Sequence, residues 1–281
     1  MKLLLAAFLF IGTSAIAQET AYTIYTSTGK KTTYKKMIGE LAKKDIVLFG
    51  ELHNNPISHW LELEVTKSLD KKNDLTLGAE MFEADNQDAL NDYLAGTIDE
   101  KGLDTVARLW TNHDTDYAPL LDYARDNGIS FVATNIPRRY ASMVNKQGGF
   151  SALDSLSDEE KSWIAPLPIE YDPTLPQYKK ILDMLGDHAT PDLVKAQAIK
   201  DATMAHFILD NFTSGQFIHY HGAFHSNYYE GILWYLQQSR PEFSYVTIST
   251  VSQANINSLD KENKGVADFI ICVDEDMTST Y

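Results

Sequence analysis

The chain has 281 residues, and its 39 acidic and 24 basic side chains give it a formal net charge of −15. This acidic balance argues against nucleic acid and against an anionic membrane surface as partners. Hydrophobic residues make up 44% of the chain, which is enough for the core of one large domain or two small ones.

The first residues have the pattern of a secretory signal peptide. A positively charged start at residues 1–2 precedes an apolar run at 3–12, and Ala-Ile-Ala at 15–17 offers a cleavage site before Gln18. That run is too short for a membrane-spanning helix, and no other apolar run approaches the required length. We therefore expect cleavage near Ala17 and export of a soluble protein, either to the periplasm or as a secreted protein.

Short apolar runs alternate with amphipathic segments along most of the chain. Residues 22–34 alternate Tyr and Thr around a Thr-Gly turn, which predicts an edge hairpin. Buried strands are predicted at 45–49, 75–82, 129–134, 216–221, 244–250 and 268–273, and helices at 34–44, 56–71, 194–212 and 228–238. These alternations predict an α/β fold with a mainly parallel, doubly wound sheet and helices on both faces.

Two long segments lack the pattern of a core strand. Residues 83–127 are polar and helical, and four prolines interrupt the middle of residues 148–212. We expect both segments to be helical lid insertions over the strand ends, within one domain that spans residues 18–281. Cys272 lies in a predicted core strand, so we expect a buried thiol and no disulfide framework.

Polar side chains follow several of the predicted strands. Glu51 and His53 follow the first, Glu80 lies at the end of the next, and the Gly-x-x-His form of residues 50–53 recurs where His225 follows another strand. Since parallel strands share one carboxyl edge, these side chains can converge. They could bind a divalent metal, or act as a general base and its orienting group in hydrolysis. One such residue alone would more often cap a turn, but several ionisable groups in one cleft are costly without a role.

A second set of candidates begins the helix after residues 129–134. Asn135 precedes Arg138 and Arg139, and arginines at a helix start suit a carboxylate or a phosphate. Tyr140 follows them, and its phenolate could ligate ferric haem iron, although a partly buried core tyrosine fits the spacing equally well.

The remaining histidines carry weaker signals. His219 and His221 share one strand face, where a packed, hydrogen-bonded pair is expected rather than two ligands. His113 and His188 lie in the predicted lid, where each alone is expected to be exposed, although either could reach a cofactor from above. His59 lies on a predicted helix and offers less reason for a functional role.

Five motifs, taken together, resemble the ChaN-like haem-binding family of the Tiki superfamily over roughly residues 40–235. They are Gly-Glu-Leu-His at 50–53, Glu-Met-Phe at 80–82, Asn-Ile-Pro-Arg-Arg-Tyr at 135–140, Ala-Gln at 196–197 with Asp201 and Met204-Ala205, and Gly-Ala-Phe-His at 222–225. The resemblance implies an exported protein of iron acquisition, with haem between an α/β domain and a helical lid. One member is a dimer that holds two stacked haems with tyrosine ligation.

Two interpretations follow from this resemblance. In the first, the protein binds haem or another iron-containing small molecule, with Tyr140 or a lid histidine on the iron, Arg138 or Arg139 near a propionate, and a homodimer as one arrangement. His53, Asn135 and His225 would also contact the cofactor. The alternative is a metal-dependent hydrolase, similar to the peptidases and erythromycin esterases of the superfamily. Its divalent metal or catalytic water would be held by four side chains: Glu51, His53, Glu80 and His225.

A third interpretation is a binding protein for another ligand that has lost any ancestral chemistry. The chain also lacks the lipoprotein cysteine of some members of the family, so the resemblance does not imply a membrane anchor.

Overall fold

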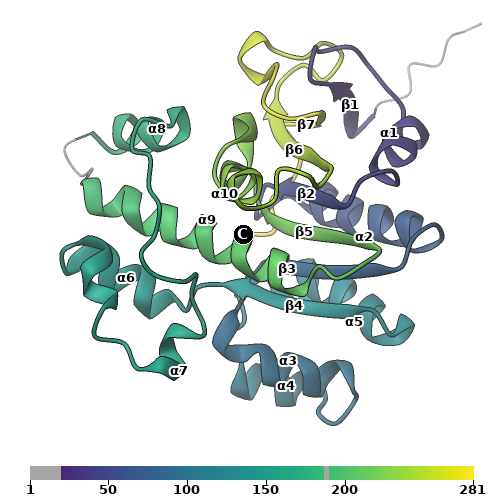
Figure 1. Ribbon diagram of the computed structural model, residues 1–281. Coiled ribbons are helices and arrows are strands. Elements are labelled where there is room, and N and C mark those ends of the chain that lie inside the picture. Colours follow the sequence, from purple (N-terminus) through teal and green to yellow (C-terminus); the bar gives the residue numbers. More distant parts are fainter. Residues whose placement is uncertain (1–19, 187–189) are drawn as a thin grey trace, which may run out of the picture.

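The computed structural model describes residues 20–186 and 190–281, so the predicted signal peptide and His188 lie outside the described residues. Seven strands form one sheet in the order β1-β7-β6-β2-β5-β3-β4 (Figure 1). Their bounds are β1 Tyr22–Thr26, β2 Ile46–Glu51, β3 Leu75–Glu83, β4 Ser130–Asn135, β5 Gln216–Gly222, β6 Tyr245–Gln253 and β7 Phe269–Asp274. All neighbouring pairs are parallel except β1 with β7, which confirms the predicted mainly parallel sheet.

The edge strand β1 takes part in the predicted hairpin and also pairs with β7. The hairpin consists of an antiparallel bridge between Tyr25 and Lys31, flanked by backbone hydrogen bonds from Thr26 to Lys30 and from Thr32 to Ile24. The antiparallel pairing of β1 with β7 was not predicted. Cys272 of β7 is buried, as expected.

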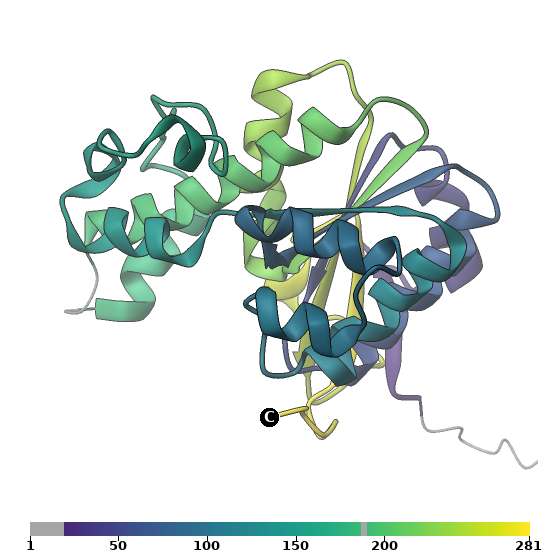
Figure 2. The same ribbon diagram turned by 90° about the horizontal axis from the view of Figure 1, so that it is seen from below.

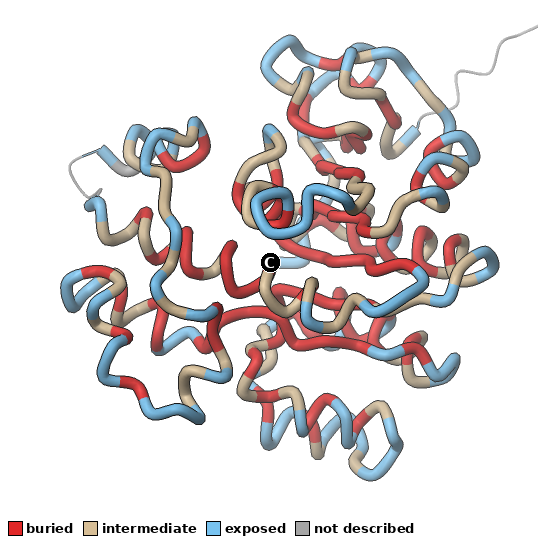
Figure 3. Tube along the Cα trace, in the orientation of Figure 1, coloured by how far each residue is buried: buried red, intermediate tan, exposed pale blue. Residues whose placement is uncertain are grey.

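The central strands are buried on both faces, as Figure 3 shows. Val47 and Phe49 of β2 point to one face, where they join an apolar cluster with α1 (Tyr34–Leu41), α2 (Pro56–Asp70) and α5 (Ala118–Asn127). Ile46 and Leu48 point to the other face, under α9 (Pro191–Asn211) and α10 (Ile232–Ser239). Alternate side chains of one apolar run thus hold helices on both faces of the sheet, as predicted.

The segment between β4 and β5 forms a separate helical group. It contains α6 (Arg138–Lys146), η3 (Gly149–Leu153), α7 (Asp158–Lys161), α8 (Pro176–Leu185) and the first half of α9. Figures 1 and 2 both place this group to one side of the sheet. Its own apolar cluster includes Val144, Leu153 and Ile199, whereas Met204 and Ile208 in the second half of α9 cover the sheet. The long helix α9 therefore connects the helical group to the core.

The segment at residues 83–127 packs differently. It contains η1 (Ala84–Asn86), α3 (Gln87–Leu94), α4 (Glu100–Val106), the π-helical turn η2 (His113–Tyr117) and α5. Leu90 of α3 and Leu121 of α5 belong to the cluster that covers one face of the sheet.

The C-terminal third contains the short turns η5 (Ala223–His225), η6 (Asn227–Tyr229) and η7 (Lys261–Asn263). Within the described part of the chain, no helix is both long and apolar enough to cross a membrane.

Candidate functional site

The carboxyl ends of β2, β3 and β5 meet at one edge of the sheet and bring four predicted residues together. Close approach there depends on two glycines. A methyl group on Gly50 would lie 2.8 Å from the Cα atom of Ala223, and one on Gly222 would lie 2.6 Å from Nε2 of His53. The imidazole of His53 therefore rests directly on the backbone of β5, beside the end of β3.

Glu51 fixes the orientation of His53. Its Oε1 atom accepts hydrogen bonds from Nδ1 of His53 at 2.6 Å and from the hydroxyl of Tyr117 at 2.8 Å. Burial opposes protonation of His53, but the hydrogen bond to Glu51 and the charge of Glu80 outweigh it and raise its pKa. Because the proton on Nδ1 points to Glu51, Nε2 is the ring nitrogen left for a ligand.

A second network holds His225 between two carboxylates. Its Nε2 lies 3.1 Å from Oε1 of Glu80, and its Nδ1 lies 2.5 Å from Oδ1 of Asp201. Glu80 also accepts the backbone N–H of Gly222 at 2.8 Å, and Tyr178 donates to Asp201 at 3.0 Å. Burial opposes protonation of His225, but the two carboxylates prevail and raise its pKa to about 10. The imidazolium form therefore predominates at neutral pH, with both N–H groups already engaged.

Two clefts adjoin at His53, the one residue common to both of their linings within the described ranges. The first has a volume of about 630 Å³ and lies between the strand ends and α8 and α9. Its apolar lining includes Ile181, Met184, Leu193, Phe224 and Val251. The second has a volume of about 680 Å³ and a more polar lining, which includes Glu80, Arg108, Asn135, Arg138 and Lys200.

The residues of the predicted Arg-Arg-Tyr motif are separated by the fold. Arg138 is exposed and borders the second cleft. Arg139 instead pairs with Asp85 at 2.5 Å and lies over the ring of Tyr140. Tyr140 is only 2% exposed, and its hydroxyl donates to Glu160 at 3.0 Å. Neither Arg139 nor Tyr140 lines either cleft.

Two predictions about histidines have opposite outcomes. His219 and His221 are the packed pair that was expected, with their Nδ1 atoms 3.0 Å apart, and burial with the nearby charge of His225 lowers the pKa of His221 to about 3. The predicted exposure of His113 was wrong. It is 3% exposed because the π-helical turn that it begins packs its ring against Phe82.

The sequence prediction missed His59 and Glu62 on α2. Nδ1 of His59 lies 3.1 Å from Oε2 of Glu51 and 3.4 Å from Oε2 of Glu62. Among the residues the structure describes, these three form the one group of three histidine, cysteine or acidic side chains with ligand atoms within 4.8 Å of one another. The local pattern does not single out Glu62, because the part-exposed Glu64 also lies between the apolar Leu61 and Val65.

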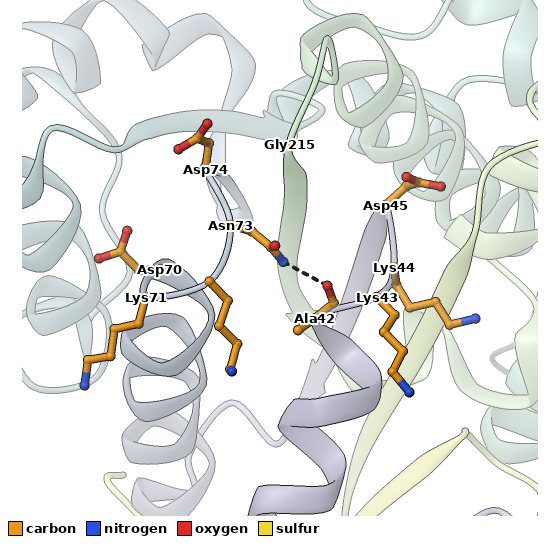
Figure 4. Close-up of a pocket in the computed structure, with 10 residues that line it drawn as sticks. Ala42, Lys43, Lys44, Asp45, Asp70, Lys71, Asn73, Asp74 and Gly215 are labelled. Carbon is orange, nitrogen blue, oxygen red and sulfur yellow. Dashed lines mark hydrogen bonds between the residues drawn. The ribbon is translucent and has the colours of Figure 1, made fainter.

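A hollow at the opposite edge of the sheet, at the amino ends of the strands, is a different kind of surface. Figure 4 shows Lys43, Lys44 and Lys71 around it with Asp45, Asp70 and Asp74, and its volume is about 620 Å³. Asn73 donates to the carbonyl of Ala42 across it at 3.1 Å. Its lining contains no histidine and lies far along the strands from Glu51, so we assign it no part in the site.

A family model described as "Haem-binding uptake, Tiki superfamily, ChaN" matches residues 37–236. The chain belongs to this family. Its fold is similar to that of ChaN from Campylobacter jejuni, a protein with cofacial haem binding, with a TM-score of 0.67 and 18% identity over 89% of this chain and 96% of that one. These findings confirm the resemblance inferred from the five motifs and the predicted fold class.

Two further proteins are similar to the chain. An erythromycin esterase in its open conformation has a TM-score of 0.51 and 13% identity, over 89% of this chain and 97% of that one. Protein RETICULATA-RELATED 5, chloroplastic, from Arabidopsis thaliana is 30% identical over 140 residues, which are 47% of this chain and 18% of that protein. The chain thus spans less than a fifth of this curated relative.

Proposed function

We propose that the protein binds haem at the junction of its two clefts and serves iron acquisition. One observation carries this proposal: His53 separates an apolar cleft of about 630 Å³ from a polar cleft of about 680 Å³. Haem combines an apolar ring with two anionic propionates, so it needs neighbouring apolar and cationic surfaces. Membership of a haem-binding uptake family supports the same conclusion.

His53 is the residue that we place nearest the iron. Metal-binding histidines commonly donate their other ring N–H to a carboxylate, which fixes the tautomer and the orientation of the ring. Glu51 holds Nδ1 of His53 in this way at 2.6 Å, and the side chain of His53 is 35% exposed beside the clefts. Its Nε2, which lies beside Gly222, is the ring nitrogen that Glu51 does not hold, and it is the atom that we place on the iron.

Tyr140 is the alternative iron ligand. Its phenolate would suit ferric iron, but its hydroxyl would first have to leave Glu160 and come out of the helical group. Arg139 would have to release Asp85 to reach a propionate. For this reason we propose Arg138 and Lys200, which border the polar cleft, as the propionate partners.

Asn135 and His225 have supporting roles in this proposal. The amide of Asn135 donates to the backbone carbonyl of Glu80 at 2.9 Å, which holds the end of β3 beside β4. His225 pairs with both Glu80 and Asp201 and holds their carboxylates in place. Both residues keep the polar end of the site in place for an anionic ligand.

We further propose export through the signal peptide at residues 1–17 and a homodimer as the haem-loaded form. The sequence pattern of those residues supports export. The cofacial haem binding of ChaN from Campylobacter jejuni supports an arrangement in which two copies meet at their clefts.

Hydrolysis is a second candidate, favoured by the hydrogen bond between Glu51 and His53. A carboxylate that orients a half-exposed imidazole is the arrangement of a general base. Burial opposes protonation of His225, but its two carboxylate partners raise its pKa to about 10, so in that function it would stay protonated rather than accept a proton. It would hold Glu80 and Asp201 in place. Glu51, His53, Glu80 and His225 would be the catalytic set, with or without a divalent metal.

The test of the haem proposal is a titration of the purified protein with haemin, followed by its absorption spectrum. We expect a shifted Soret band that saturates at micromolar haemin. Folded protein that leaves the spectrum of haemin unchanged would contradict the proposal. Turnover of a chromogenic ester or peptide, with added Mn²⁺, Co²⁺ or Zn²⁺ and lost in His53→Ala, would instead support the hydrolase.

A further inference from the structure

Helix α2 carries a histidine and a glutamate into the interior of the protein. His59 and Glu62 are three residues apart, so they lie on the same side of the helix, under the end of β2. His59 is 6% exposed, Glu62 is 0% exposed, and Glu51, which meets them from β2, is 1% exposed. This cluster of charged side chains is therefore buried, unlike the ion pairs that exposed side chains form at a protein surface.

The surroundings of His59 fix its tautomer. Its Nε2 lies 3.2 Å from the backbone carbonyl of His53 and 3.4 Å from a carboxylate oxygen of Asp116. Both neighbours are acceptors, so Nε2 carries a proton. The other nitrogen, Nδ1, therefore faces the carboxylates of Glu51 and Glu62.

Hydrogen bonds satisfy this cluster poorly. Nδ1 of His59 lies 3.4 Å from Glu62, at the long limit for a hydrogen bond, and its 3.1 Å contact with Oε2 of Glu51 does not have hydrogen-bond geometry. Within residues 20–186 and 190–281, Oε2 of Glu51 and Oε1 of Glu62 have no hydrogen-bond partner at all. Buried carboxylate oxygens are costly in this state, and a cation among them would remove the cost.

We propose that Glu51, His59 and Glu62 bind a divalent transition-metal ion of the Zn²⁺ class. Tetrahedral bonds of about 2.1 Å place neighbouring ligand atoms about 3.4 Å apart. The separations of 3.1 Å and 3.4 Å between Nδ1 and the two carboxylates fit such an edge. One imidazole with two carboxylates suits Zn²⁺ and similar ions, whereas Ca²⁺ and Mg²⁺ prefer oxygen ligands alone.

The proposed site adjoins the first cleft only through Glu51. His59 and Glu62 line neither of the two clefts, and Glu51 turns a different oxygen to each partner, Oε1 to His53 and Oε2 to His59. A metal ion on Oε2 would fix the carboxylate that orients His53. The ion would thus influence His53 through Glu51. Its binding does not depend on the haem proposal.

The test is the metal content of the full chain, expressed in medium supplemented with Zn²⁺ and dialysed before analysis. The variants are Glu62→Gln, which keeps the shape of the side chain, and Glu64→Gln as a control. Glu64 lies on the same helix and is part-exposed beside Lys67, 3.1 Å away. We expect about one Zn²⁺ per chain in the wild type and in Glu64→Gln, and at least roughly tenfold less in Glu62→Gln.

A second measurement tests whether a variant that lacks Zn²⁺ is still folded. The wild type, stripped with a chelator, should gain melting temperature when Zn²⁺ is added, and circular dichroism should show that Glu62→Gln is folded but gains none. Wild-type protein that neither retains Zn²⁺ nor gains melting temperature would overturn the proposal. Equal retention in Glu62→Gln would also overturn it. Either result would indicate that His59 and the two carboxylates share a proton and do not bind a metal ion.

Discussion

Nδ1 of His53 lies 2.6 Å from Oε1 of Glu51, and this contact leaves Nε2 as the ring nitrogen that Glu51 does not hold. Glu51 is buried, and the hydroxyl of Tyr117 bonds the same oxygen at 2.8 Å. The carboxylate therefore cannot turn freely, and the imidazole is fixed before any ligand arrives. Such fixed orientation lowers the cost of binding a metal or of positioning a base.

The first prediction concerns Glu51→Gln. This change removes the negative charge that, against the opposing effect of burial, helps to raise the pKa of His53. The pKa of His53 should fall, and haem affinity should drop by roughly 10- to 100-fold, as for other groups that orient a metal-binding histidine. NMR titration of His53 and a haemin titration would measure the two effects, with Glu64→Gln as the control. An unchanged pKa of His53 in the variant would refute the role given to Glu51.

The second prediction concerns pH and His225. Its pKa is raised from 6.5 to about 10, because Glu80 and Asp201 outweigh the effect of burial. A raised pKa in the folded state stabilises the protein below the unfolded value, and this contribution is lost as pH rises through the folded value. Stability should therefore decline between pH 6.5 and about 10.

Urea unfolding of the wild type and His225→Asn across that pH range would measure this decline. The variant should be less stable at neutral pH and should show a shallower loss on the way to alkaline pH. Identical slopes in both proteins would show that His225 does not hold its extra proton in the folded state.

The third prediction uses the contact between two strand ends. A methyl group in Gly222→Ala would lie 2.6 Å from Nε2 of His53, so the imidazole must move. Haem binding should weaken while the fold is retained, because Gly222 has an ordinary negative φ of −55°. Gly39→Ala on α1 is the matched control, since a methyl group there has no neighbour within 4 Å. Equal haem affinity in the two variants would argue against a ligand at Nε2 of His53.

The fourth prediction separates the two candidate iron ligands. Tyr140→Phe removes the hydrogen bonds with Glu160 and Arg139 and should lower the free energy of unfolding by about 1 kcal/mol. Haem affinity should stay close to that of the wild type, which urea unfolding and haemin titration would establish together. Loss of haem binding in folded Tyr140→Phe would assign the iron to Tyr140 instead.

The convergence of the site was predictable because it follows from topology. Glu51, Glu80 and His225 come at the ends of apolar runs, and parallel strands bring such ends to one edge. The buried pair of His219 and His221 followed from strand alternation in the same way. In each case a local pattern was enough, because the regular geometry of the sheet determines where each residue of a strand lies.

The missed residues depended on packing that a local pattern does not contain. A large apolar side chain such as Trp60 would normally mark the buried side of α2, but Trp60 is 49% exposed, and His59 and Glu62 are on the buried side. Leu61 and Val65 lie between the side of α2 that contains Trp60 and the side that contains His59 and Glu62. Helical spacing alone therefore does not show which of these two sides is buried. Likewise, the burial of Tyr140 depends on α7, which brings Glu160 to its hydroxyl from a distant turn.

The most direct test of the haem site at His53 is a parallel haemin titration of the wild type and His53→Ala, with His206→Ala as a control on α9. We expect a saturable Soret shift in the wild type and the control, and at least roughly tenfold weaker binding or an altered Soret band in His53→Ala. An identical spectrum and affinity in folded His53→Ala would contradict the site proposed for haem.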